Sequence, residues 1–236
     1  MDAEEVVNRT EVVKEVISML ANGPAEKWNW YYRTRQFDEA IELKAQDAML
    51  LDFDYENRNV MYQCINDRFA RKAPIDYLEF GVAGGVSMKH WLDINPNPES
   101  RFYGFDSFEG LPEDWTASSP KGSFSQEGIV PDLQDKRVRF IKGLFQETVE
   151  PFLRIFKPRN KLVVHMDADL YSSTLYCLMH LNRHLLPGSI ILFDEFNSRN
   201  CSDECAALAD YCKACHRDFK MLARREDNMK VAVEML

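Results

Sequence analysis

Residues 161–195 read KLVVHMDADLYSSTLYCLMHLNRHLLPGSIILFDE, and this stretch decides the fold. Two apolar runs, 161–166 and 189–193, flank a segment of helical length, 173–186, that Pro187-Gly188 closes. Strand, helix and strand with short connections predict a right-handed βαβ unit with parallel strands. An open α/β sheet is therefore the expected framework.

Each apolar run ends in acidic residues. Asp167 and Asp169 follow the first run, and Asp194 and Glu195 follow the second. The carboxyl ends of neighbouring parallel strands meet at the edge where open sheets bind their ligands. Carboxylates that converge there repel each other unless a positive group lies between them, and a hard divalent cation is the simplest such group. The pattern predicts a metal site, and the alternative is that Asp167 and Asp194 only cap the segments that follow.

The composition narrows the class of protein. The 236 residues are 45% hydrophobic, which suits one globular α/β domain with additions. A net charge of −9 without a stripe of lysine or arginine argues against binding to nucleic-acid backbones. The apolar runs are far too short to cross a bilayer, and the acidic N-terminus is unlike a targeting signal. We expect a soluble, cytoplasmic protein that contacts neither membrane nor nucleic acid.

Hydrophobic periodicity predicts the other elements of the sheet and its helices. Strands are predicted at 76–80, 101–106, 138–142, 219–223 and 230–234, and helices at 86–92, 145–156 and 203–218. These elements together with residues 161–195 form a main α/β domain at 75–236.

The segment before Ala73-Pro74 is predicted to be mostly helical. Helices are expected at about 3–20, 38–51 and 55–71. The aromatic residues from Trp28 to Tyr32 form either a lid over a pocket or a hydrophobic strap on the core. We assign residues 1–74 to a separate N-terminal helical region.

A glycine-rich turn, EFGVAGG at 79–85, lies between a predicted strand and a predicted helix. Such a turn lets the backbone pass close to a ligand, and a helix N-terminus favours a negative group. Asp106 ends the next strand, at the distance from the turn where an acid commonly binds ribose hydroxyls. Together they predict an adenosine-containing ligand, either S-adenosylmethionine or a nicotinamide cofactor. A purely structural turn, with Asp106 as its cap, is the alternative.

Cysteines and histidines offer weaker signals. Cys201, Cys205, Cys212 and Cys215 have a spacing that would suit zinc, but the last three fall on one helical pattern and are better interpreted as small core residues. His165 lies within a buried strand pattern and is interpreted as structural.

Five motifs occur in an order that resembles one known family. They are LEFGV at 78–82, DSFEGLP at 106–112, KGLFQET at 142–148, DADLYSST at 167–174 and FDEF at 193–196. Together they resemble the macrocin O-methyltransferase family, over roughly residues 75 to 235. That family includes enzymes that methylate sugars of macrolide and aminocoumarin antibiotics.

The resemblance implies a fold and an activity. The fold would be the class I methyltransferase (Rossmann-like) fold, an α/β architecture with helices on both faces of a seven-stranded, mostly parallel sheet whose last strand is antiparallel. The activity would be transfer of a methyl group from S-adenosylmethionine, usually with Mg²⁺, to a hydroxyl of a sugar or another small natural product. The resemblance also implies a homo-oligomer, with residues 1–74 as the lid and oligomerisation region.

The resemblance further assigns roles to individual residues. Asp167, Asp194 and Glu195 would bind the metal, and Asp169 would be the general base if the strand is still extended there. Glu79, Gly81 and Gly85 would line the methionine end of the donor, and Asp106 would hold its ribose. The full set expected to bind the donor is Glu79, Gly81, Ala83, Gly84, Gly85, Ser87, Asp106, Ser107, Phe108, Gly143 and Asp167.

The chain also departs from the family pattern. Asp194-Glu195 stands where the family usually has two aspartates, and no histidine lies between Pro112 and Val138, where some relatives place a catalytic one. Two alternatives remain open. One is a protein that keeps the fold without turnover or with another chemistry, and the other is an NAD-dependent oxidoreductase.

Overall fold

The computed structural model describes residues 41–54, 57–198 and 201–236. The predicted helix at about 3–20 and the aromatic residues from Trp28 to Tyr32 lie outside this part of the chain, so both interpretations of the aromatic residues stay predictions.

The chain divides into two compact units, residues 1–43 and 44–236. The division lies closer to the N-terminus than the predicted boundary between 74 and 75. The reason is that β1 (Met49–Leu51) pairs in parallel with β7 (Phe219–Arg225) and so belongs to the sheet. The predicted helix over 38–51 therefore does not reach residue 51.

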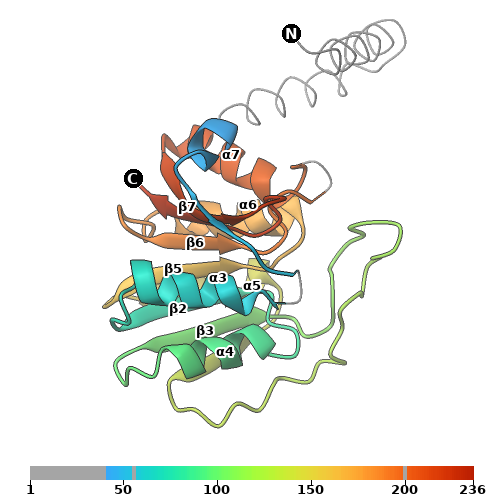
Figure 1. Cartoon of the computed structure of the whole chain (residues 1–236). Coiled ribbons are helices and arrows are strands. Elements are labelled where there is room, and N and C mark those ends of the chain that lie inside the picture. Colours follow the sequence, from blue (N-terminus) through green and yellow to red (C-terminus); the bar gives the residue numbers. More distant parts are fainter. Residues whose placement is uncertain (1–40, 55–56, 199–200) are drawn as a thin grey trace, which may run out of the picture. The chain divides into compact units, whose positions relative to one another are not determined.

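The second unit is built on one eight-stranded sheet with the order β1-β7-β8-β6-β5-β2-β3-β4 (Figure 1). Its other strands are β2 (Ile75–Phe80), β3 (Arg101–Asp106), β4 (Val138–Lys142), β5 (Lys161–Met166), β6 (Ile190–Phe193) and β8 (Val231–Met235). Only β8 runs antiparallel to its neighbours, β6 and β7. Strands β2 to β8 form the expected seven-stranded arrangement, and β1 adds an eighth strand at its edge.

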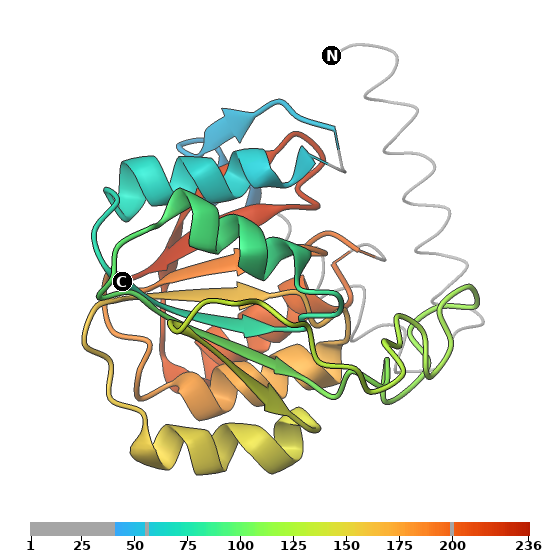
Figure 2. The same cartoon turned by 90° about the horizontal axis from the view of Figure 1, so that it is seen from below.

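Helices cover both faces of the sheet (Figure 2). On one face lie α3 (Asn59–Cys64), its π-helical continuation (Ile65–Phe69) and α4 (Val86–Ile94). On the other face lie α5 (Phe145–Ile155), α6 (Tyr171–Leu181) and α7 (Glu204–Cys215). Every residue of β2 and β6 is buried, as expected for parallel strands covered on both sides.

A buried ion pair anchors the amino end of β2. Asp76 is fully buried, and its carboxylate accepts hydrogen bonds from Arg101 Nε at 2.8 Å and Nη2 at 2.6 Å. The backbone N–H groups of Arg159 and Asn160 donate to Oδ2 at 2.6 and 3.2 Å. Burial raises the pKa of Asp76, but these donors outweigh it and hold the pKa below its ordinary value.

We expect Asp76→Asn to lower the free energy of unfolding at pH 7 by roughly 2–3 kcal/mol, less than for a fully buried pair because Arg101 keeps some solvent contact. Because the folded pKa is depressed, this stabilisation is present above about pH 4 and is lost as the pH falls through the folded value. Urea unfolding should therefore separate variant and wild type at pH 7 and bring them together in strong acid. Glu150→Gln, which breaks an exposed pair with Arg154, is the control that should change little. An equal gap at both pH values would contradict the prediction.

Candidate active site

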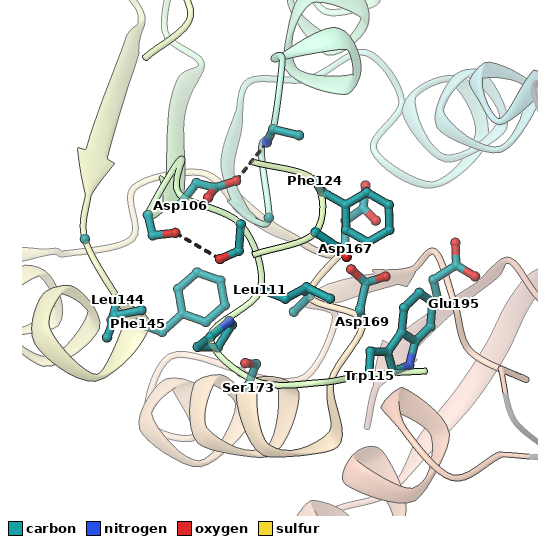
Figure 3. A pocket seen from close by; sticks show the side chains of 18 of the residues that line it. Asp106, Leu111, Trp115, Phe124, Leu144, Phe145, Asp167, Asp169, Ser173 and Glu195 are labelled. Atoms are coloured by element: carbon teal, nitrogen blue, oxygen red, sulfur yellow. Dashed lines mark hydrogen bonds between the residues drawn. The ribbon is translucent and has the colours of Figure 1, made fainter. Parts of the chain in front are cut away.

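A cavity of about 400 Å³ lies at the carboxyl ends of the parallel strands (Figure 3). Segments that follow β2, β3, β4, β5 and β6 all contribute to its wall, because parallel strands end at a common edge. Of the predicted site residues, those that line it are Gly81, Ala83, Asp106, Ser107, Gly143, Asp167, Asp169 and Glu195. The predicted residues outside the lining are Glu79, Gly84, Gly85, Ser87, Phe108 and Asp194.

The glycine-rich turn brings two backbone segments together. Gly81 has a φ of +92°, and a Cβ placed on it would lie 1.8 Å from the carbonyl oxygen of Asp167. The Gly81 N–H donates to Phe105 O at 3.0 Å, and the Asp167 N–H donates to Phe80 O at 2.9 Å. A glycine at position 81 thus lets the first acidic segment pass directly beside the turn.

Asp106 fastens the same turn from the next strand. Its Oδ2 accepts hydrogen bonds from the N–H groups of Val82 and Ala83, both at 2.8 Å, and its Oδ1 accepts one from Phe108 at 2.7 Å. Asp106 therefore does cap the turn, which was the structural alternative to ribose binding. Asp106 also lines the cavity, and a carboxylate has further lone pairs, so ribose binding stays a compatible prediction.

Glu79 and Ser87 lie beneath the turn. Glu79 is fully buried, and Ser87 Oγ donates a hydrogen bond to its Oε1. Its Oε2 has no hydrogen-bond partner among the described residues. Burial raises the pKa of Glu79 to about 7. An unpartnered buried carboxylate oxygen is costly, so this atom favours the approach of a hydrogen-bond donor.

The acidic residues after β5 and β6 converge on groups that the chain itself supplies. Asp194 is buried, and its Oδ1 lies 3.0 Å from His165 Nε2. Its Oδ2 lies 2.5 Å from Arg58 Nη1 and 3.1 Å from Lys230 Nζ. The same Arg58 nitrogen lies 3.1 Å from Asp167 Oδ2. The structure thus places positive side chains between the carboxylates.

His165, expected to be structural only, is part of this cluster. It is fully buried on β5, and its Nδ1 is hydrogen-bonded to the Tyr77 hydroxyl at 2.7 Å. Burial lowers the pKa of His165, but the Asp194 carboxylate outweighs it and raises the pKa. The sequence did indicate this position for His165. It lies two residues before Asp167, and alternate residues of a strand share a face.

Ligand atoms of His165, Asp167 and Asp194 all lie within 4.8 Å of one another, and this is the group among the described residues that could hold a metal ion. The structure thus brings together Asp167 and Asp194, two of the three predicted ligands, with His165 rather than Glu195 as the third member of the group. The roles of Asp167, Asp194 and Glu195 as metal ligands stay predictions. Glu195 lines the cavity, and its Oε1 lies 4.0 Å from Lys230 Nζ. The helix that follows Asp167 is α6, and its N-cap residue is Leu170, so Asp167 does not occupy the capping position.

Asp169 does not continue the strand. β5 ends at Met166, and Asp169 has a φ of +59°, so the extended backbone that its predicted orientation required is absent. The side chain nevertheless lines the cavity near Asp167 (Figure 3). Burial and then the neighbouring carboxylates of Asp167 and Glu195 raise the pKa of Asp169 to about 8.

Two features of the site were not predicted. The long loop after β3 supplies apolar walls from Leu111, Trp115 and Phe124 (Figure 3), and Trp115 Nε1 donates to Asp203 Oδ2 at 3.0 Å. The aromatic residues of this loop were the feature of the sequence that could have indicated such a wall. Glu204, buried at the start of α7, accepts hydrogen bonds from the N–H groups of Ala168 at 3.4 Å and Glu195 at 3.0 Å. Glu204 therefore ties the two acidic segments together.

A disulfide joins Cys201 to Cys205 beside Glu204. Neither the zinc interpretation nor the interpretation as core residues included this bond. Cys205, Cys212 and Cys215 do fall on one helix, α7, as the pattern predicted, although Cys212 and Cys215 are only half-buried.

Comparison with known proteins gives a consistent result. The model of the family described as Macrocin-O-methyltransferase (TylF) matches residues 14–222. One relative is 8-demethyl-8-(2,3-dimethoxy-alpha-L-rhamnosyl)-tetracenomycin-C 4'-O-methyltransferase from Streptomyces olivaceus. It is 29% identical to this chain over 178 residues. That match covers 65% of this chain and 63% of the relative, which is less than two thirds of the relative's length. Demethyldecarbamoylnovobiocin O-methyltransferase from Streptomyces niveus is 26% identical over 212 residues, or 78% of each chain.

Among solved structures, the calicheamicin methyltransferase CalS11 is similar with a TM-score of 0.57 and 21% identity, over 99% of this chain and 93% of that one. This likeness confirms the class I methyltransferase fold. Within the described residues, every helix is too short or too polar to span a lipid bilayer. The family model spans most of the sequence, from the segment before the sheet to β7, and the chain therefore belongs to the macrocin-O-methyltransferase (TylF) family.

Proposed function

We propose that this chain transfers a methyl group from S-adenosylmethionine to a hydroxyl group of a sugar or another small natural product, with Mg²⁺ at the acidic cluster. The observation that carries this proposal is a shared cavity, whose wall includes Gly81 and Asp106 as well as Asp167, Asp169 and Glu195. A donor and a metal-bound acceptor could meet there without any change of fold. The activities named for the Streptomyces relatives point the same way.

The donor fits the groups around the glycine-rich turn. Asp106 is positioned to accept hydrogen bonds from ribose hydroxyls, and Gly81 lines the same cavity. The unpartnered Oε2 of the buried Glu79 offers an acceptor for a donor group such as an ammonium. When bound, S-adenosylmethionine would supply an activated methyl group, and the role of these residues is to hold it in one orientation.

The carboxylates fit a hard cation. Asp167 and Asp194 would hold it, since their oxygens converge and since oxygen ligands suit Mg²⁺. A bound cation would orient an acceptor hydroxyl and lower its pKa. Asp169 is the candidate to accept the hydroxyl proton, because its side chain lines the cavity beside Asp167.

The acceptor would lie against the loop after β3. Trp115, Phe124 and Leu111 form an apolar wall facing the carboxylates, and a sugar ring presents both an apolar face and hydroxyl edges to such a wall. The negative charge of the site argues against an anionic acceptor next to Asp169 and Glu195.

Two measurements test the proposal. Calorimetric titration with S-adenosylhomocysteine, with and without Mg²⁺, tests the donor site, and transfer of a labelled methyl group to glycosylated natural products tests the reaction. Asp167→Ala should abolish Mg²⁺-dependent transfer and leave the affinity for S-adenosylhomocysteine within about threefold of wild type, because Asp167 is only one of the residues expected to bind the donor and most of the others lie in the turn and around Asp106.

Normal turnover by Asp167→Ala would remove the metal from the proposal. Failure of S-adenosylhomocysteine to bind in either condition would reject the methyltransferase and favour a non-catalytic protein or, with binding of NAD, an oxidoreductase.

A further inference from the structure

Arg58 occupies the position between the two carboxylates that would hold a cation. Its Nη1 lies 3.1 Å from Asp167 Oδ2 and 2.5 Å from Asp194 Oδ2. One guanidinium nitrogen therefore contacts both of the predicted metal ligands. The bonds are charge-assisted and are made to the same oxygens that would face a metal ion.

We propose that Arg58 competes with the divalent cation for Asp167 and Asp194 and thereby sets the metal affinity of the site. Mg²⁺ requires its oxygen ligands at about 2.0–2.1 Å, so an ion held between the two carboxylates would take the place that Arg58 Nη1 occupies. Two positive groups held a few ångströms apart would also repel each other strongly in a partly buried site. Binding of a cation thus requires Arg58 to withdraw.

Arg58 is the displaceable member of the cluster. Its side chain is 34% exposed and lines the cavity, and it lies at the N-cap of the short helix α3. Lys230, by contrast, is 1% exposed, and its Nζ also donates to the backbone oxygen of Asp194 at 3.0 Å. His165 is fully buried and is held by Tyr77. Lys230 and His165 would therefore stay in place while Arg58 turns toward the open cavity.

This arrangement has two consequences. Without a metal, Arg58 compensates the two carboxylates and stabilises the fold around them. With a metal, the cost of separating Arg58 from them weakens binding. The inference rests on the metal site of the proposed function, but it can be tested with the metal alone and without any acceptor.

The experiment is titration of the full chain with Mn²⁺, followed by electron paramagnetic resonance, on wild type and three variants. Arg58→Gln should bind Mn²⁺ at least tenfold more tightly than wild type. Arg58→Lys keeps the charge on a shorter side chain and should fall between the two. Arg154→Gln removes the same charge from an exposed pair with Glu150 and should match wild type. The melting temperature of Arg58→Gln should be lowered without metal and should rise more with Mn²⁺ than that of wild type.

An Arg58→Gln variant with the Mn²⁺ affinity of Arg154→Gln would overturn the competition. If Arg58→Gln does not fold, Arg58→Lys is the test. Mn²⁺ binding by Arg58→Lys that is no tighter than that of wild type would then reject the proposal. Failure of Mn²⁺ to bind any variant would reject both this inference and the metal in the proposed function. Titration of the same samples with S-adenosylhomocysteine would then show whether the donor site survives on its own.

Discussion

Gly81→Ala is expected to lower the free energy of unfolding by more than about 3 kcal/mol and to disrupt the site. The new Cβ would lie 1.8 Å from the carbonyl oxygen of Asp167 and 2.7 Å from its carbonyl carbon. Both atoms belong to the backbone, so no side-chain rotation can relieve the overlap. The φ of +92° adds strain for any residue other than glycine. The acidic segment after β5 must therefore move away from the turn.

Substitutions at two other glycines separate the effect of the overlap with Asp167 from the effect of backbone strain. Gly122 has a φ of +85°, and no described atom lies within 4 Å of the position that a Cβ would take there, so Gly122→Ala measures backbone strain alone, about 1–2 kcal/mol. Gly84 lacks a positive φ, and the nearest atom to its Cβ position is Gln126 Oε1 at 3.7 Å, so Gly84→Ala should be close to neutral. Urea unfolding of the three variants gives the comparison. A loss in Gly81→Ala no larger than in Gly122→Ala would show that the close approach to Asp167 does not matter.

Much of the sheet could be predicted from the sequence because its strands are short apolar runs between clear turns. The predicted bounds of β3 and β4, and the apolar run that forms β5, agree with the structure. β1 could not be predicted in this way. Met49–Leu51 continues a helical pattern, and only its pairing with β7, far along the chain, makes it a strand. Local propensity contains no information about a pairing strand so far away in the sequence.

The site was predictable on its acidic side and not on its basic side. Acids after two neighbouring strands can be recognised in the sequence, because the topology brings those strand ends together. Arg58 precedes the first strand of the seven-stranded core, and Lys230 lies near the end of the chain next to β8, so only the folded structure brings them to Asp194. The same contacts explain how carboxylates can converge without a metal.

The predicted assembly of the chain into a homo-oligomer stays a prediction.

The second large effect is expected at Asp194. Asn at this position would lower the free energy of unfolding by about 3–5 kcal/mol, because it removes the negative charge that faces buried Lys230 and His165. Burial raises the pKa of Asp194, but His165, Lys230 and Arg58 outweigh it and hold the pKa far below its ordinary value. The carboxylate is therefore charged at every pH at which the protein is handled, and its loss is felt throughout that range.

A double-mutant cycle with Lys230→Met distinguishes lost charge balance from lost shape. Each single variant leaves one buried charge less well compensated, whereas Asp194→Asn with Lys230→Met removes both charges. The double variant should therefore be more stable than the sum of the single losses predicts, by about 1–3 kcal/mol. Lys220→Met is the matched control, because Lys220 pairs with Glu234 at the half-exposed surface and should combine additively with Asp194→Asn. Additive losses for Asp194 and Lys230 would mean that their ion pair contributes nothing beyond packing, and that Lys230 is not what allows Asp194 to lie beside the other acids of this site.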